Sequence, residues 1–177
     1  MKHVIPLMLL SVILVACGQK TTYDPYKVSP QNDSVVSVNG NGFEVDFKTN
    51  ESNTKTIHIK LNDVVGKDAL FDTGCSGMLI SSLEIQDLLK EGAISKDDYL
   101  GESQSSIADG SVITNARFNI REVSITDKNG ISHTLHDIAA TVVENPGANI
   151  LIGSAVIDNL ATHSYTVDLD KKVIRFQ

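Results

Sequence analysis

The stretch Phe71-Asp72-Thr73-Gly74-Cys75-Ser76 connects two apolar runs, Ala69-Leu70-Phe71 and Met78-Leu79-Ile80. The triplet Asp72-Thr73-Gly74 therefore falls at a strand-to-turn junction, where glycine lets the backbone fold tightly. A carboxylate held at such a junction can come close to a second carboxylate. Two carboxyls in contact share one proton, so one acts as a base toward water and the other as an acid toward a carbonyl. An ordinary turn is the alternative explanation, since Asp and Gly are common turn formers.

Two further motifs follow this loop along the chain. Ala108-Asp109-Gly110-Ser111 lies within residues 105–113, which predict a hairpin with Asp-Gly in a two-residue turn. Ile150-Leu151-Ile152-Gly153 is an apolar run before a short helix. In this order the three motifs resemble those of the retropepsin-like, single-lobed aspartic proteases, a family with bacterial members related to the retroviral enzyme. The resemblance covers about residues 55 to 177.

The resemblance implies a role for each residue of the first motif. Asp72 would be the catalytic carboxylate. Thr73 would lock the loop by hydrogen bonding, and Gly74 would let two such loops approach each other closely. No cofactor or metal is implied.

The resemblance also assigns roles to the later motifs. The hairpin would be a flap that closes over substrate, with Ala108, Asp109, Gly110 and Ser111 near its tip. Ile150, Leu151, Ile152 and Gly153 would form a strand that supports the catalytic loop from behind, and the terminal strand at 173–176 looks like an element used for dimer contacts.

The chain contains one Asp-Thr-Gly and no second Asp-Thr-Gly or Asp-Ser-Gly. A working pair of carboxyls therefore requires two copies related by a two-fold axis, each contributing Asp72. We expect an aspartic endopeptidase that acts as a homodimer on peptide or protein substrates. Two alternatives stay open: a peptide-binding or assembly module of the same fold without catalysis, and an unrelated β-rich lipoprotein in which the triplet is only a turn.

Alternating apolar and polar residues predict the fold class. Segments 43–47, 57–61, 118–125, 135–143, 165–169 and 173–176 are typical of strands, whereas 81–91 and 155–160 favour short helices. Many short strands with turn signals indicate an all-β domain. With the resemblance, the expectation is a single-lobed, acid-protease-like closed barrel with a flap hairpin and one or two short helices.

The N-terminal residues have the pattern of an export signal. Residues 1–16 begin with Lys2 and His3, continue with an apolar run and end in Leu14-Val15-Ala16 before Cys17, which resembles the lipobox of bacterial lipoproteins. We expect residues 1–16 to be removed and Cys17 to carry lipid; an uncleaved membrane anchor is the alternative. Residues 17–42 read as a flexible tether and 43–177 as the protease domain. The protein would be exported to the bacterial cell envelope and anchored to a membrane.

Charge and the remaining chemistry exclude other classes of function. The formal net charge is −7, and Lys and Arg are scattered, which argues against nucleic-acid binding. His133 and His136 are three residues apart on a strand and would point to opposite faces, so no metal site is expected. Cys75 has no partner if Cys17 is lipidated. A cysteine protease using Cys75 with His58, His133 or His163 is the weaker alternative, because apolar surroundings raise a thiol pKa.

Overall fold

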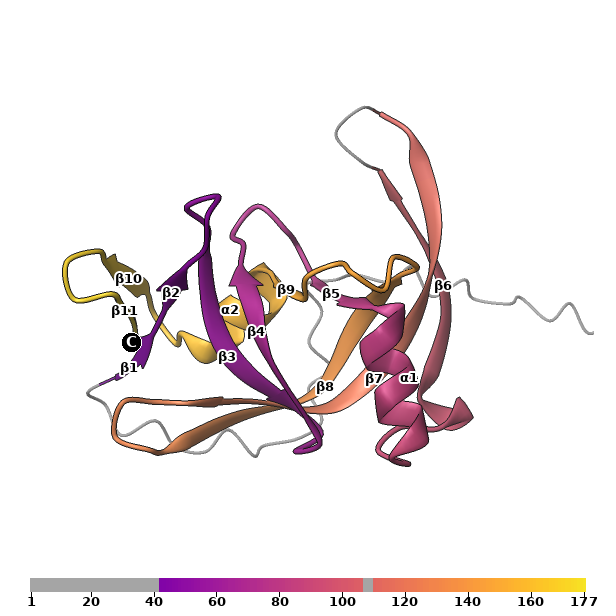
Figure 1. Cartoon of the computed structure of the whole chain (residues 1–177), viewed down its shortest axis with the longest axis horizontal. Coiled ribbons are helices and arrows are strands. Elements are labelled where there is room, and N and C mark those ends of the chain that lie inside the picture. Colours follow the sequence, from indigo (N-terminus) through magenta and orange to yellow (C-terminus); the bar gives the residue numbers. More distant parts are fainter. Residues whose placement is uncertain (1–41, 107–109) are drawn as a thin grey trace, which may run out of the picture.

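The structure is a computed structural model that describes residues 42–106 and 110–177. Within these residues the chain is all-β with two short α-helices and one 3₁₀ turn (Figure 1). The elements in chain order are β1 (Phe43–Asp46), β2 (Lys48–Thr49), β3 (Lys55–Leu61), β4 (Val65–Phe71), β5 (Met78–Ser81), α1 (Ser82–Lys90), η1 (Lys96–Asp98), β6 (Tyr99–Ser106), β7 (Val112–Thr126), β8 (Ser132–Val143), β9 (Leu151–Ile152), α2 (Ser154–Leu160), β10 (Tyr165–Asp168) and β11 (Val173–Phe176).

The larger sheet closes on itself and forms the expected barrel. Its strands follow the order β2-β3-β4-β9-β5-β8-β7-β6, and β3 pairs additionally with β7. The six strands β3, β4, β9, β5, β8 and β7 therefore form a closed ring. The long strand β7 makes this closure possible because it pairs with β8 along most of its length and with β3 near its end, through Ile59↔Ile125 and Leu61↔Val123. Apolar side chains that alternate along the strands fill the ring, among them Ile59, Leu61 and Ile120.

A second sheet joins the two ends of the described chain. Its order is β1-β11-β10, with β11 in the middle, so the last strand pairs on both sides within its own chain. Phe43 and Phe176 are both buried and their rings stack at a centroid distance of 5.0 Å. The ring of Phe71 in turn makes edge contacts with Tyr165 and Phe176. This terminal sheet therefore packs directly against the end of β4.

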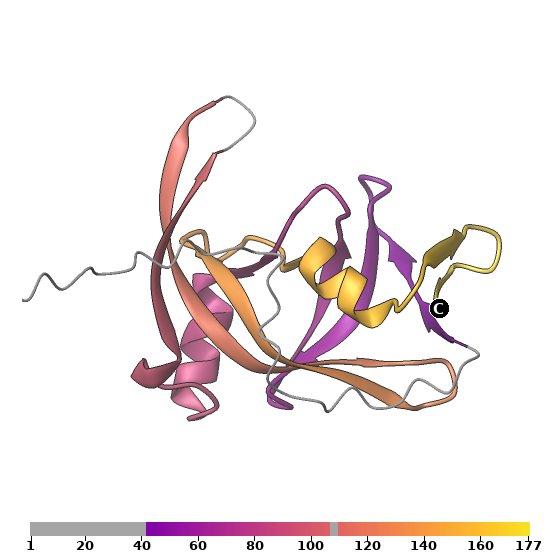
Figure 2. The same cartoon turned by 180° about the vertical axis from the view of Figure 1, so that it is seen from behind.

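The β6–β7 hairpin extends beyond the barrel as an arm, on the same side as the loop that follows β4 (Figures 1 and 2). The register pairs Ser106 with Val112. The expected two-residue turn at Asp109-Gly110 lies partly outside the described residues and stays a prediction. Ala108 and Asp109 lie outside the described residues, as do the expected signal at 1–16 and all of the 17–42 tether except its last residue, Gly42. No described helix is long and apolar enough to cross a membrane.

Candidate active site

The loop of residues 72–77 connects two strands that are not neighbours in the sheet. Strand β9 lies between them, parallel to β4 through Phe71↔Ile152 and antiparallel to β5 through Met78↔Ile152. The backbone N–H groups of Leu70 and Asp72 donate to the carbonyls of Ile150 and Ile152 at 2.8 and 3.1 Å. The apolar run at 150–152 thus pairs with both strands that the loop connects.

The start of α2 holds the other side of the loop. The backbone N–H groups of Gly153, Ser154 and Ala155 donate to the carbonyls of Gly77, Cys75 and Ser76, at 3.0, 2.8 and 3.0 Å. The first N–H groups of a helix have no partner inside the helix, and α2 has no side-chain cap. The loop carbonyls therefore supply the partners that a cap would otherwise provide, and helix and loop form one hydrogen-bonded unit.

Gly153 is required where it stands because the loop passes over it. A Cβ atom at this position would lie 2.2 Å from the carbonyl oxygen of Cys75 and 2.3 Å from that of Gly77. Such separations are far inside van der Waals contact, and backbone carbonyls cannot rotate away as a side chain can. A residue with a side chain would therefore require the 72–77 loop to move away from residue 153.

Asp72 is half-buried at the end of β4, with its carboxyl directed into its own turn. Its Oδ1 atom accepts a hydrogen bond from the N–H of Gly74 at 2.9 Å, and its carbonyl accepts one from the N–H of Cys75 at 3.2 Å. These two bonds hold Asp72 in place at the start of the loop. No described hydrogen bond joins its carboxyl to a second carboxyl.

Thr73 and Gly74 are exposed at the top of the loop. The family resemblance implies a locking hydrogen bond for Thr73; among the described contacts, the carbonyl of Thr73 meets Ser154 Oγ at 3.5 Å. Sequence reasoning missed Ser154. Its place immediately after Gly153, at the start of a helix, is the signal that could have identified it, because serine often contacts backbone near helix ends.

Cys75 does not have the surroundings of a nucleophile. Its partial burial raises the pKa of its thiol; a backbone hydrogen bond with Gly77 acts in the opposite direction, and the nearby charge of Asp72 raises the pKa further. A raised pKa keeps the thiol protonated and unreactive near neutral pH. The three histidines considered as bases have other contacts: His58 pairs with Asp68 at 2.9 Å, His133 pairs with Asp127 at 3.1 Å, and the backbone N–H of His163 donates to Gln177.

Of the four residues expected in a flap, Gly110 and Ser111 lie within the described chain, and both are exposed near the end of the arm. Gly110 has φ +85°, a conformation that favours glycine. The arm does not contact the 72–77 loop through any described hydrogen bond.

Other polar groups of the described residues form structural pairs. A hollow of about 180 Å³ is lined by Lys48, His58, Asp68 and Asp127 among others, and it lies away from the 72–77 loop. The hydrogen bond from Lys48 is the largest cause that lowers the pKa of Asp68, and the one from His58 is the next. Asp68 is thus already paired with two neighbours in the chain. His133 also stacks on Phe43, with ring centroids 3.6 Å apart. Within residues 42–106 and 110–177 no three His, Cys, Asp or Glu side chains gather as a metal site.

Comparisons with known proteins give two distant structural likenesses. A retropepsin-like aspartic protease from Rickettsia conorii is 16% identical, with a TM-score of 0.49, over 75% of this chain and 90% of that one. Basic 7S globulin from soybean is 14% identical, with a TM-score of 0.47, over 85% of this chain and 45% of that one, so the match spans less than half of the soybean protein. No family model matches the chain. No curated protein matches it either.

Proposed function

We propose that this protein is an aspartic endopeptidase that works as a homodimer, with Asp72 from each copy forming the catalytic pair. The observation that carries the proposal is the loop geometry. Asp72 stands at the start of a loop that β9 and α2 fix by backbone hydrogen bonds; the residue is half-buried, and no described hydrogen bond joins its carboxyl to a second carboxyl. A rigidly held, half-complete site is what a two-fold symmetric enzyme requires.

In the dimer the two Asp72 carboxyls would share one proton, because both cannot ionise in contact. The charged carboxyl would remove a proton from a water molecule bound between them, and that water would attack the peptide carbonyl. The protonated carboxyl would donate to the carbonyl oxygen as the tetrahedral intermediate forms. Its collapse, with a proton passing to the leaving amine, would release the two peptides without a covalent enzyme intermediate.

The β6–β7 arm is suited to cover an extended substrate. Its hairpin stands on the same side of the barrel as the 72–77 loop (Figures 1 and 2). Closure of the arm over a bound peptide would exclude bulk water, and its backbone would hold the peptide as an added strand.

The free edge of the terminal sheet supports a route to the dimer. Ser164 and Gln177 exchange two backbone hydrogen bonds, so by the alternation of an antiparallel ladder the backbones of Tyr165 and Val167 face away from β11. No described strand pairs with that side of β10. The opposite edge is less available, since Glu44 of β1 already accepts from the N–H of Lys128. Pairing of β10 with its symmetry mate would join two terminal sheets beneath the two Phe71 side chains.

We also propose that the mature chain begins at a lipidated Cys17 and is anchored in the bacterial cell envelope, as the lipobox-like residues 14–17 suggest. Anchoring would confine the copies to a surface and favour their pairing. Labelling of cells with a radioactive fatty acid tests the anchor: label incorporated by the wild type and absent from Cys17→Ser supports it, and an unlabelled wild type refutes it.

Cleavage of a peptide library by the purified full chain tests the enzymatic proposal. Asp72→Asn preserves the size and the hydrogen bond to Gly74 but removes the ionisable group, so we expect cleavage to disappear, a loss of at least about a thousandfold. The variant should unfold at the same denaturant concentration as the wild type. A folded dimer that cleaves nothing between pH 4 and 8 would favour the peptide-binding module instead.

A further inference from the structure

The side chain of Glu102 points to its face of the arm because strand β6 contains an irregularity in its pairing with β7. Tyr99 pairs with Phe118, but Glu102 pairs with Ala116, so three steps along β6 match two along β7. This extra residue is a β-bulge, and Gly101 within it has φ +89°. Residues three apart on a regular strand point to opposite faces, whereas the bulge places Tyr99 and Glu102 on the same face.

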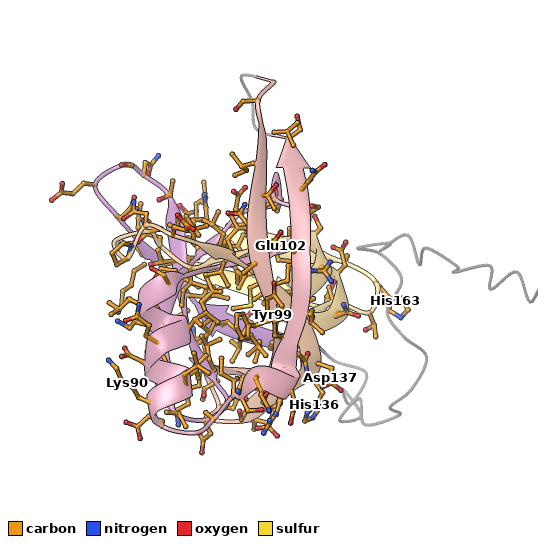
Figure 3. All side chains as sticks on the ribbon, turned by 90° about the vertical axis from the view of Figure 1, so that its right-hand side faces the viewer. Lys90, Tyr99, Glu102, His136, Asp137 and His163 are labelled. Carbon is orange, nitrogen blue, oxygen red and sulfur yellow. The ribbon has the colours of Figure 1, made fainter. Side chains whose placement is uncertain are left out.

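That face is the one turned toward the body of the protein. Ala116 and Phe118 both pack against the hydrophobic core, and the ring of Tyr99 contacts that of Phe118 at a centroid distance of 5.4 Å. Glu102, opposite Ala116, therefore emerges where the arm leaves the barrel. Tyr99 and Glu102 lie one above the other on the front strand in Figure 3.

The Glu102 carboxylate is exposed and makes no hydrogen bond or ion pair with any other described residue. The other described positions on its face toward the tip are uncharged: Gln104, Ser106, Val112 and Thr114. Among these described positions, Glu102 therefore carries the only charge.

The foot of the arm is linked to the catalytic loop by one row of paired residues. It crosses the sheet from β6 to the residue before Asp72, through Tyr99, Phe118, Ala140, Met78, Ile152 and Phe71. A peptide that lies between the 72–77 loop and the arm would pass along this side of the barrel, with Glu102 beside it.

We infer that Glu102 determines specificity and selects peptides that carry a lysine or arginine side chain at the position lying against the arm. This inference rests on the proposed function. The basic side chain would form an ion pair with the carboxylate, while its aliphatic part would lie against Ala116, the partner of Glu102 on β7. The bulge at Gly101 would serve this role, since a regular strand would turn the carboxylate to the outer face.

Peptide binding to the full chain carrying Asp72→Asn, which cannot cleave, tests the inference. The probes are three sets of fluorescein-labelled decapeptides that are identical except for Lys, Gln or Glu at one scanned position, measured by anisotropy. We expect Lys peptides to bind about fivefold more tightly than Gln peptides at one position, and Glu peptides more weakly than either. The preference should vanish with Glu102→Gln and in 1 M salt, which screens exposed charge pairs.

A second variant separates position from net charge. Glu102→Gln combined with Ser103→Glu keeps the total charge but moves the carboxylate to the opposite face of β6, so we expect it to lose the Lys preference too. The inference is overturned if this variant or Glu102→Gln retains the preference, or if Lys and Gln peptides bind equally throughout. Equal binding with intact Asp72-dependent cleavage would overturn the specificity alone. Absence of any peptide binding would overturn the proposed function with it.

Discussion

Asp72 is held in place chiefly by backbone atoms of residues distant in the sequence. Its N–H donates to Ile152, and the carbonyls of the following loop accept from Gly153, Ser154 and Ala155. Side-chain substitutions in the loop leave these bonds intact, but a side chain at Gly153 does not. The position of the Asp72 carboxylate therefore depends more on the absence of a side chain at residue 153 than on the side chains next to Asp72 in the sequence.

Gly153→Ala should destabilise the protein by about 3 kcal/mol, because the added methyl group overlaps two backbone carbonyls that cannot move independently. Urea unfolding measures this cost. Gly77→Ala is the matched control within the same loop, since a Cβ there meets no atom within 4 Å, and we expect it to change the free energy of unfolding by no more than about 0.5 kcal/mol. Equal stability of the two variants would show that the loop does not lie over residue 153.

At the scale of elements, the two helices begin in different ways. The N-cap Ser81 of α1 accepts from the N–H of Leu83 and contacts buried Glu84, a side-chain cap that is local in sequence. Helix α2 instead gives its first N–H groups to the loop. The cap of helix α1 therefore does not involve the 72–77 loop, whereas α2 and that loop depend on each other.

The short turn η1 is tied to the barrel by Asp98. This buried carboxylate accepts two hydrogen bonds from Arg121 of β7, at 2.9 and 2.7 Å, and one from the N–H of Ser95. The hydrogen bonds from Arg121 lower the pKa of Asp98, against the opposing effect of burial. A carboxyl whose pKa falls on folding stabilises the protein above its unfolded pKa, and this contribution is lost as the pH falls through the folded pKa.

Asp98→Asn should therefore lower stability at pH 7, and its deficit relative to the wild type should shrink as the pH falls below about 4, where the wild type also loses the charge. Thermal unfolding between pH 2 and 8 measures both curves. Asp97→Asn removes the same charge from an exposed neighbour and should follow the wild type closely. A deficit that stays constant down to pH 2 would contradict the charged pair.

The sequence predicts the elements whose signals are local. Alternating residues at 57–61 identify β3, and the helical stripe at 81–91 identifies α1 to within a residue at each end. These elements were predictable because a strand with one buried face and a helix with one buried face each leave a periodic pattern of apolar residues in their own segment.

Features that depend on distant pairing were not predictable in the same way. The terminal sheet pairs Phe43 with Phe176, and no pattern within either segment predicts that contact. The segments around the hairpin were expected as separate strands, yet β7 runs unbroken through Val112–Thr126 because it pairs with β8 and β3 in turn. The bulge in β6 has one local signal in the sequence, because an isolated glycine inside a strand, here Gly101, often marks a bulge.

At the scale of the whole molecule, the account requires a two-fold partner, and the free edge of β10 is the described surface suited to it. Thr166 is exposed near the middle of that edge. Thr166→Lys should weaken the dimer at least about tenfold, because edge lysines oppose strand pairing and two would face each other near the axis. Analytical ultracentrifugation measures the dissociation constant. Thr49→Lys, on the edge strand β2 of the other sheet, should leave it unchanged; equal effects of the two variants would place the interface elsewhere.

Mixing wild-type chains with Asp72→Asn chains tests the shared site most directly. With wild type held constant above the dimer dissociation constant, each mixed dimer would carry one carboxyl and be inactive, so activity should fall to about a half at equal amounts and about a tenth at ninefold excess. Asp72→Asn combined with Thr166→Lys, which pairs more weakly, should inhibit less at each excess. Activity that stays constant at every excess of Asp72→Asn, while the two proteins exchange subunits, would contradict a catalytic pair made from two copies of Asp72.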